Sequence, residues 1–339
     1  MRKPASFDRS PRKGTRLTKT LSIAAAIFCL NAAHAQDSFP SKPITIIVPF
    51  AAGGTMDKLA RELAEPLRRH FGQPVLISNQ PGAGGNVGLA AAMKAAPDGH
   101  TWVMAHNNMA TSPALYRTLA FKPETDFEPL GVVVDVPLVL VARPQNPCKN
   151  AAELISWMAG QKNPTIANAG AGSGSHLCGL LLQSALKISI TTVPYRGNAP
   201  ALTDLLGGHV DLMCDLTANA LPYIQAGQVR ALAVTTTEPL TGTPLADVPT
   251  TARFGMPEVE LSIWFSLYAP KGTPTAVQKK INEAVALAVK NDVFVRAQTI
   301  AGVQIVKDAR RTPEGHRAFL AKESARWIPL IKAAGTYAE

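Results

Sequence analysis

Three glycine-rich segments could bind an anion through their backbone. They are residues 51–55, 82–86 and 170–175, and each is expected to join the end of a strand to the start of a helix. The first N–H groups of a helix have no partner within it and carry about half a positive charge. They can hold a carboxylate without an arginine, and glycine lets a ligand approach the backbone closely. The pattern indicates an anion site, although ordinary turns also favour glycine.

Residues suited to other chemistry occur without the spacing that it needs. The residue types of a hydrolase triad are present in Ser173, Ser175, His176 and Asp215. There is no GxSxG elbow, however, and His176 is expected to begin a helix, where it would cap or pack. No P-loop and no HExxH motif is present, and the glycines at 82–88 only faintly resemble a dinucleotide-binding loop. We therefore expect no cofactor, no metal and no enzymatic activity, and a secreted serine hydrolase is the least favoured alternative.

Two charged residues follow predicted strands and could touch a ligand. Arg196 stands between Tyr195 and Gly197, and its two-pronged guanidinium could clamp a carboxylate. A solvated loop arginine is an equally good interpretation. Asp215 ends a strand, where it could bind an amino or hydroxyl group of the ligand or cap the next turn. The sequence leaves both pairs of alternatives open.

Alternating strands and helices must position these residues. The β-branched run at 44–48 is typical of a strand buried on both faces, and Leu59, Leu63 and Leu67 recur on one face of the following helix. Further strands are expected at 74–77, 101–105, 138–141, 165–168, 191–195, 210–213 and 231–235, and further helices at 87–95, 151–158, 176–186, 200–206, 275–290 and 313–334. This order predicts an α/β fold with parallel, doubly wound sheets in two lobes, the C-terminal part returning to the first lobe.

Residues 1–35 are interpreted as a secretory signal peptide. Seven basic residues and one acid precede an apolar stretch from Leu21 to Ala33. Ala33-His34-Ala35 then offers a small-x-small cleavage pattern. The stretch is shorter than the roughly 20 apolar residues of a membrane anchor. We expect export to the periplasm with cleavage after Ala35. The 34 basic and 24 acidic residues of the chain then fall to 27 and 23, which gives no reason to expect nucleic-acid binding.

Three cysteines remain after the leader, at positions 148, 178 and 214. Their spacing fits neither a CxxC redox pair nor a zinc site. An oxidising compartment would permit one disulfide and leave one thiol free. Because each cysteine lies in an apolar or turn context, we expect all three to act as small buried hydrophobic side chains.

Motifs along the whole chain after residue 35 closely resemble the Bug (TctC) family of periplasmic binding proteins, and they stand in family order. The matching segments are PSKPITIIVPFAAGGTMD (40–57), NQPGAGGN (79–86), APDG (96–99), GSGSHL (172–177), VPYRGNAPAL (193–202), DLLGG (204–208), RALAVT (230–235) and APKGTP (269–274). The resemblance implies a type II periplasmic binding protein fold, a Venus flytrap with a central cleft. We expect one α/β domain from residues 36–135 plus 260–339 and a second from residues 136–259.

The resemblance also implies where a ligand is held. Family members typically hold a carboxylate through backbone and hydroxyl groups of the first strand–helix loop and of the Gly/Ser loop. Together with the candidates above, this predicts the ligand-binding residues Ala51, Gly53, Gly54, Thr55, Asn107, Ser173, Ser175, His176, Tyr195, Arg196, Gly197 and Asp215. Asp215 matches a position that resembles a selector for amino-bearing ligands. Asn107-Asn108 departs from a Thr-His pair common in the family, and so alters the expected cleft wall.

The same resemblance implies a partner. We expect a monomer that captures a small carboxylate, such as a di- or tricarboxylate, an amino acid or an aromatic acid. It would deliver this ligand to a TctA/TctB-type permease of a tripartite tricarboxylate transporter. The alternative is a ligand-presenting sensor subunit of a signalling system. Neither hypothesis involves nucleic acid.

Overall fold

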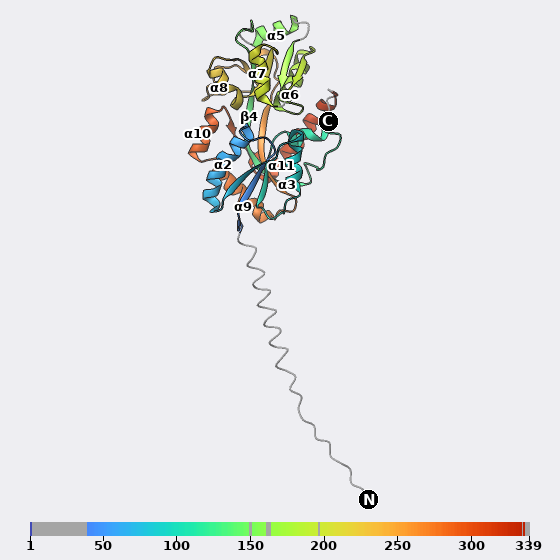
Figure 1. Ribbon diagram of the computed structural model, residues 1–339, viewed down its shortest axis with the longest axis vertical. Coiled ribbons are helices and arrows are strands. Elements are labelled where there is room, and N and C mark those ends of the chain that lie inside the picture. Colours follow the sequence, from blue (N-terminus) through green and yellow to red (C-terminus); the bar gives the residue numbers. More distant parts are fainter. Residues whose placement is uncertain (2–38, 149–150, 161–163, 196, 334, 336–339) are drawn as a thin grey trace. The chain divides into compact units, whose positions relative to one another are not determined.

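The computed structural model describes residue 1 and residues 39–148, 151–160, 164–195, 197–333 and 335. The predicted signal peptide, its cleavage site and Arg196 lie outside the described residues. Contacts divide the chain into Met1–Ser41 and Lys42–Glu339, and the fold described below is that of the second unit. Figure 1 shows its helices and strands.

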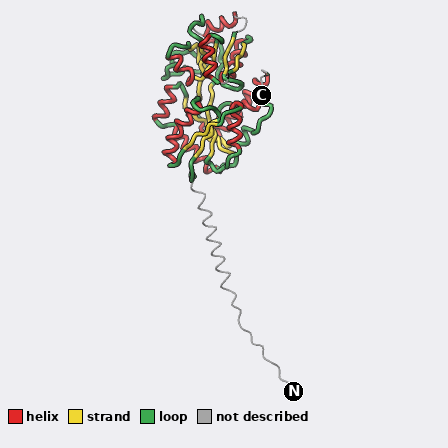
Figure 2. The backbone as a smooth tube through the Cα atoms, in the orientation of Figure 1, coloured by secondary structure: helices red, strands yellow, loops and turns green. Residues whose placement is uncertain are grey.

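A mixed sheet of ten strands lies at the centre of this unit. The strands are β1 (Ile44–Val48), β2 (Val75–Asn79), β3 (Thr101–Ala105), β4 (Phe127–Ala142), β5 (Thr165–Asn168), β6 (Thr191–Pro194), β7 (Leu212–Leu216), β8 (Arg230–Val234), β9 (Ser262–Pro270) and β10 (Gln304–Ile305). Their order is β2-β1-β3-β9-β4-β7-β5-β6, and β8 and β10 also pair with β4. Helices flank the strands on both sides in Figure 2. The predicted α/β class is confirmed.

Helices connect most of these strands. They are α2 (Thr55–Phe71), α3 (Asn86–Met93), α4 (Asn108–Leu115), α5 (Ala151–Gly160), α6 (Gly174–Leu186), α7 (Asn198–Gly207), α8 (Thr217–Gln225), α9 (Thr275–Ala288), α10 (Asp292–Ile300) and α11 (Pro313–Ala333). Leu59, Leu63 and Leu67 are buried on one face of α2, as their spacing predicts. Helices α4, α8 and α10 have no counterpart among the predicted elements.

Strands β1, β2, β3, β9 and the first part of β4 form what we call the first half (residues 44–137 and 262–333). β1 runs parallel to β2 and β3, whereas β9 fits antiparallel between β3 and β4. The sheet is therefore mixed, and the expectation of a purely parallel arrangement is wrong. The cause is the return of the chain after residue 260, because β9 enters beside β3 from the opposite direction.

The 16 residues of β4 belong to both parts of the sheet. Residues 127–137 pair with β9, and residues 138–142 pair with both β7 and β8. Two register shifts lie in the first portion, one of them at Gly131, whose φ is 121°. The sequence predicted only residues 138–141, because Pro129, Gly131 and Pro137 interrupt the strand pattern; bulges tolerate such residues.

Strands β5 to β8 and the end of β4 form the second half (residues 138–261). β5 lies parallel to β6 and β7, and β4 runs antiparallel to β7 and β8. A core cluster includes Val139, Leu205, Met213 and Leu221, so helices α7 and α8 pack onto this part of the sheet. The two halves are defined here by strand pairing, and their action as separate domains stays a prediction.

The core of the first half is aromatic and holds the C-terminal helix in place. Trp102, Trp264 and Trp327 are fully buried. His316 of α11 accepts the Gly131 N–H through Nδ1 at 3.2 Å, and its Nε2 lies 2.8 Å from the Tyr268 hydroxyl. Burial lowers the pKa of His316 to about 3, so the ring is neutral. These bonds attach α11 to β4 and β9, as the predicted return of the C-terminal part requires.

Candidate functional site

The first loop, residues 49–54, ends β1 and opens α2. Residues 51–54 are exposed. Gly54 is the N-cap with φ −74° and ψ 171°, and within the described part of the chain no side chain caps the helix. The first N–H groups of this 17-residue helix are therefore available to an acceptor from outside the protein. Such N–H groups at a helix start are suited to bind an anion. Of the predicted residues, Ala51, Gly53, Gly54 and Thr55 lie together here.

A buried carboxylate behind the first loop fixes its shape. Asp57 accepts the Gly53 N–H at 2.9 Å and an Asn79 amide N–H at 3.0 Å. Arg61 contacts the same carboxylate at 3.0 Å. Burial alone would raise the pKa of Asp57, but the hydrogen bonds from Arg61, Gly53 and Asn79 outweigh it and lower the pKa to about 2. Asp57 is thus an ionised anchor for the loop.

The Gly/Ser loop, residues 169–175, ends β5 and opens α6. Its polar groups bond one another: Ser173 is the N-cap, and its Oγ accepts the His176 N–H at 3.2 Å. Ser175 Oγ accepts the Ala169 N–H at 2.9 Å and lies 3.0 Å from Ser173 Oγ. The predicted Ser173, Ser175 and His176 are therefore brought together, with both hydroxyls engaged in the loop.

His176 serves the loop as an acceptor. Its Nδ1 accepts the Gly172 N–H at 3.1 Å, and the side chain is buried. Burial lowers the pKa of His176, so the ring is neutral. Among the described residues, neither serine hydroxyl bonds a histidine ring nitrogen, and so the geometry of a Ser-His hydrolase is not formed.

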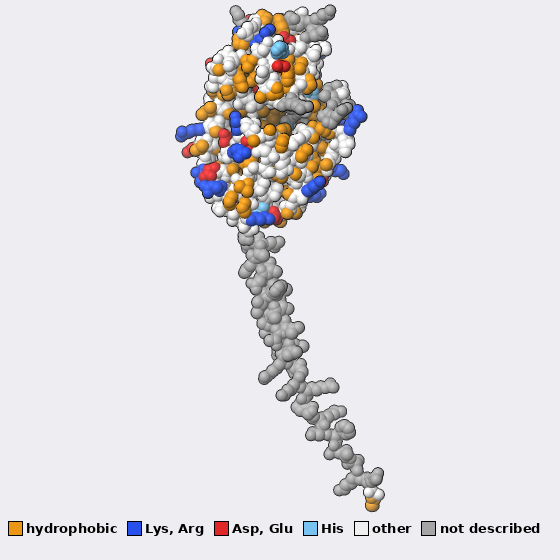
Figure 3. All heavy atoms as spheres, in the orientation of Figure 1, with side chains coloured by type: hydrophobic (Ala, Val, Ile, Leu, Met, Phe, Trp, Pro, Cys, Tyr) orange, Lys and Arg blue, Asp and Glu red, His pale blue; other side chains and the backbone are white. Residues whose placement is uncertain are grey.

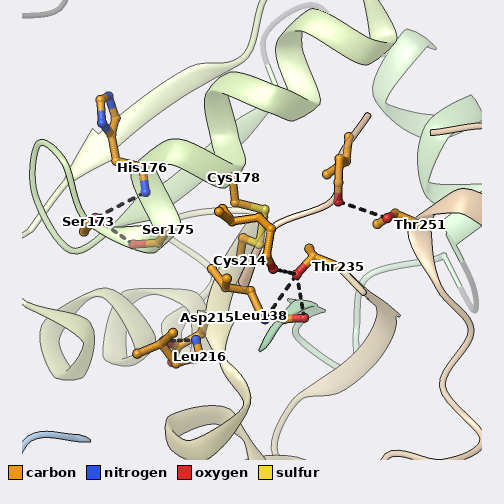
Figure 4. Close-up of a disulfide and its surroundings, with 12 residues drawn as sticks. Leu138, Ser173, Ser175, His176, Cys178, Cys214, Asp215, Leu216, Thr235 and Thr251 are labelled. Carbon is orange, nitrogen blue, oxygen red and sulfur yellow. Dashed lines mark hydrogen bonds between the residues drawn. A yellow bond between two sulfur atoms is a disulfide. The ribbon is translucent and has the colours of Figure 1, made fainter. Parts of the chain in front are cut away.

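A disulfide joins α6 to β7 directly behind this loop (Figure 4). It links Cys178, two residues after His176, to Cys214, the neighbour of Asp215. The expectation that all three cysteines are merely buried hydrophobic side chains is therefore wrong for this pair. It holds for Cys148, which is buried and free. The spacing of 36 residues gave no signal, because only the sheet brings β7 beside β5 and its helix.

Asp215 is fully buried at the end of β7. Its Oδ1 accepts the Leu216 N–H at 2.7 Å, the Asn219 amide at 3.4 Å and the Asn198 amide. Its Oδ2 has no hydrogen-bond partner among the described residues. Burial outweighs these hydrogen bonds and raises the pKa of Asp215 to about 6. The side chain bonds amides of α7 and α8 as well as the next turn.

The segment after β6 contributes backbone rather than a free hydroxyl. Tyr195 donates its hydroxyl to Asp204 Oδ2 at 2.6 Å, and burial together with Asp204 raises the pKa of Tyr195 to about 12. Its carbonyl oxygen lies 3.4 Å from the point where a Cβ on Gly170 would stand, so its backbone adjoins the Gly/Ser loop. Gly197, with φ 112°, is the N-cap of α7 without a side-chain cap.

Helix α4 brings the first half against the Gly/Ser loop. Asn107 is 1% exposed, and its Nδ2 lies 3.5 Å from the Gly172 carbonyl oxygen. Asn107 Oδ1 and the Thr111 hydroxyl have no hydrogen-bond partner among the described residues. The sequence pointed to Asn107 but missed the helix, because Pro113 and several buried polar residues obscure its apolar pattern.

A second bond joins the halves through a residue that was not predicted. Thr55 donates its hydroxyl to Asn219 Oδ1 at 2.8 Å. Asn219 lies in the first turn of α8 and also reaches Asp215. Its place at a helix start directly after a strand was the available signal, but α8 itself was not predicted. The predicted residues Thr55 and Asn107 of the first half thus each bond a residue of the second half that was not predicted, Asn219 and Gly172.

Comparison with known proteins identifies the family. A family model described as "Tripartite tricarboxylate transporter family receptor" (TctC) matches residues 59–336. The chain belongs to the TctC family. Its members are periplasmic solute-binding proteins and not enzymes.

Solved TctC-type structures resemble this chain in fold. The periplasmic binding protein BugD is 38% identical, with a TM-score of 0.80 over 89% of this chain and 100% of that one. MatC from Rhodopseudomonas palustris with bound malate is 35% identical, with a TM-score of 0.78 over 86% and 100%. A second R. palustris protein, with adipate, is 34% identical, with a TM-score of 0.80 over 88% and 98%. The type II periplasmic binding protein fold is thereby confirmed.

The described helices and the described metal-binding side-chain types were compared with what a membrane span or a metal site needs. None of the helices that the structure describes is long and apolar enough to traverse a bilayer. The described His, Cys, Asp and Glu side chains form no group of three that could bind a metal ion. On the face drawn in Figure 3, basic and acidic side chains are interspersed.

Proposed function

We propose that this TctC protein captures a small dicarboxylate between its two halves. The observation that carries the proposal is the exposed start of α2 at Gly54, which no side chain of the described residues caps. One ligand carboxylate would bind the N–H groups of the first loop, at Ala51 to Thr55. The opposite wall would come from the Gly/Ser loop, the backbone at Tyr195 and Gly197, and Asn107 and Asp215. The malate and adipate found with the two R. palustris proteins support a dicarboxylate.

Arg196 is proposed as an accessory cation at this wall. In this proposal the first-loop N–H groups would bind the carboxylate, so Arg196 would adjust affinity rather than create the site. The proposed mechanism is closure over the ligand. In it the predicted domain of residues 36–135 plus 260–339 moves against the predicted domain of residues 136–259. Ligand that contacts both halves would favour the closed population.

The wider setting follows from the family. We propose that the chain acts as a monomer in the periplasm after cleavage behind Ala35, and delivers its ligand to a TctA/TctB-type permease. A sensor subunit that presents the ligand to a signalling partner is the alternative. Citrate, glutamate and benzoate represent the other carboxylate classes that the test must include.

Thermal unfolding with a panel of malate, adipate, citrate, glutamate and benzoate tests the proposal. A dicarboxylate should raise the melting temperature in a concentration-dependent way. Gly54→Leu should abolish this rise, because the new side chain would cover the helix start. A Cβ at Gly54 would meet only the Ala51 carbonyl oxygen, at 3.6 Å, so the free protein should fold normally.

Gly160→Leu is the matched control, since it adds the same side chain at an open glycine at the end of α5. It should respond to ligand as the wild type does. Equal stabilisation of Gly54→Leu and the wild type would refute the first loop as the carboxylate site.

A further inference from the structure

One polar chain runs from the first half into the second at the start of α8. The Thr55 hydroxyl donates to Asn219 Oδ1 at 2.8 Å, and Asn219 Nδ2 lies 3.4 Å from Asp215 Oδ1. Thr55 is the first residue of α2, whereas Asn219 and Asp215 belong to α8 and β7. The Asn219 amide therefore contacts the proposed carboxylate loop on one side and the buried acid on the other.

The direction of the Asn219 amide is set by its neighbours. Asp215 Oδ1 accepts the Leu216 N–H and the Asn198 amide, so the carboxylate is held in place from two elements. Asn219 must turn its N–H toward this oxygen, which leaves its carbonyl oxygen for the Thr55 hydroxyl. The bond across the halves is thus a consequence of the bonds within the second half.

The region behind this bond is hollow. A pocket of about 140 Å³ separates α2, α8 and α10 beside the middle of β4. Thr55 and Asn219 stand at its wall, and much of the remaining lining is apolar, with Leu59, Val134 and Val303 among it. The halves are therefore incompletely packed at this edge. α8, α10 and α2 lie along one side of the unit in Figure 1.

The other hydrogen bonds between the halves among the described residues differ from this bond in their place. Arg326 Nη2 donates to the Glu260 carbonyl oxygen at 2.7 Å, next to the point where the chain passes from the second half into β9. Thr217 Oγ1 donates to the Gly302 carbonyl oxygen at 3.2 Å, close to the pairing of β10 with β4, where little displacement is expected on closure. Asn107 Nδ2 to Gly172 O is long, at 3.5 Å. The Thr55–Asn219 bond is short, and it lies at the proposed ligand loop.

We propose that the Thr55–Asn219 hydrogen bond is a latch that favours closure before ligand arrives, which makes Asn219 a positioning residue for binding. This inference rests on the proposed function. One net hydrogen bond shifts a two-state equilibrium about 2- to 10-fold. Because ligand must enter while the halves are apart, the latch should slow association; because it favours the competent closed form, it should also strengthen binding.

Asn219→Ala tests the latch in the full chain. Spin labels on Ser184→Cys and Lys279→Cys, both exposed and one in each half, would report the distance between the halves. Without ligand, Asn219→Ala should move the distance distribution toward longer values, and saturating malate or adipate should restore it. The dissociation constant should rise about 2- to 10-fold while the association rate constant increases.

Two controls separate the latch from a general effect on folding. Gln225→Ala truncates an exposed amide at the other end of α8 and should change neither the distance nor the rate. Thr55→Ser keeps the hydroxyl and should retain the short distance. Identical ligand-free distances in Asn219→Ala and the wild type would overturn the latch. The distance measurement needs no ligand, so failure of the carboxylate panel would count against the proposed function alone.

Discussion

The first loop and the Gly/Ser loop both join a strand to a helix, but they treat their polar groups in opposite ways. The first loop is exposed, and its helix has no side-chain cap. The Gly/Ser loop caps its helix with Ser173 and bonds Ser175 to its own backbone. The first is therefore suited to accept an anion, whereas the second is suited to present a fixed wall.

The acidic residues behind the two loops differ in their partners and in their pKa values. Asp57 is paired with Arg61 and its pKa is lowered to about 2, whereas Asp215 accepts hydrogen bonds from neutral amides of the described residues and its pKa is raised to about 6. One loop is anchored by a charge and the other adjoins a carboxyl group that resists ionisation. The Gly/Ser region has a covalent connection instead, because the Cys178–Cys214 disulfide ties α6 to β7.

Removing that disulfide should give the largest loss of stability. Cys178→Ala/Cys214→Ala should lower the free energy of unfolding by about 2–4 kcal/mol, because the open chain gains entropy when a 36-residue connection is released. Urea denaturation would measure the loss. The matched control is Cys148→Ala, which removes a free buried cysteine. If the double variant and the control unfold at the same urea concentration, the disulfide is not what stiffens the Gly/Ser loop.

The contributions of Asp57 and Asp215 to the free energy of unfolding should depend on pH in opposite directions, each by on the order of 2 kcal/mol. Asp57 has a folded pKa below its unfolded value of about 3.9, so its contribution is present above pH 4 and is lost as the pH falls through 2. Asp215 has a folded pKa near 6, so the folded state holds an extra proton and stability falls as the pH rises from about 4 to 6.

Asp57→Asn and Asp215→Asn, each compared with the wild type across pH 2–7, would measure these terms. The difference in unfolding free energy should change mainly below pH 4 for Asp57→Asn and between pH 4 and 6 for Asp215→Asn. The same slope in both comparisons would show that the two carboxyl groups do not differ as described.

Replacing a glycine should cost more stability in the Gly/Ser loop than in the first loop. Gly172 has φ 77°, and an added Cβ would lie 2.5 Å from Leu115 Cδ1, so Gly172→Ala should cost about 2 kcal/mol of stability. Gly54 has a negative φ and open space, so Gly54→Ala should cost under about 0.5 kcal/mol. Thermal unfolding of the pair measures both. Equal costs would contradict the contrast between a packed and an open loop.

Loss of the N-cap of α6 should cost less stability than the change at Gly172. Ser173→Ala removes the acceptor of the His176 N–H and should destabilise the protein by about 1 kcal/mol. Ser184→Ala, an exposed change within the same helix, serves as the control. Calorimetry would measure both variants. No difference between them would mean that Ser173 does not act as a cap.

The sequence predicted the elements with local signals and missed those that depend on distant partners. The strand at 44–48 and the leucine face of α2 are visible in the chain itself, because burial imposes their periodicity. The first loop and the Gly/Ser loop were likewise predicted from glycine and serine between strand and helix. Asn219, by contrast, matters through Thr55, which is 164 residues away.

The sheet itself shows the same limit. The pairing of Cys178 with Cys214 and the antiparallel entry of β9 follow from tertiary contacts that no window of sequence contains. β4 was underestimated because Pro129 and Gly131 interrupt its strand pattern, and they lie at a register shift that depends on pairing with β9. Local propensity thus predicted where the first loop and the Gly/Ser loop lie, but not the tertiary contacts that hold them.

The insertion of β9 between β3 and β4 has a consequence for how the chain acquires its structure. β3 and β4 are not neighbours in the sheet, so the first half lacks the strand that joins them until residues 262–270 are present. The second half needs only β4 to β8, which are contiguous in the chain. We expect its sheet to assemble earlier, since short loop closures cost less entropy than long ones. The first loop, which follows β1, is synthesised early. It would then be among the last parts of the chain to reach its final surroundings.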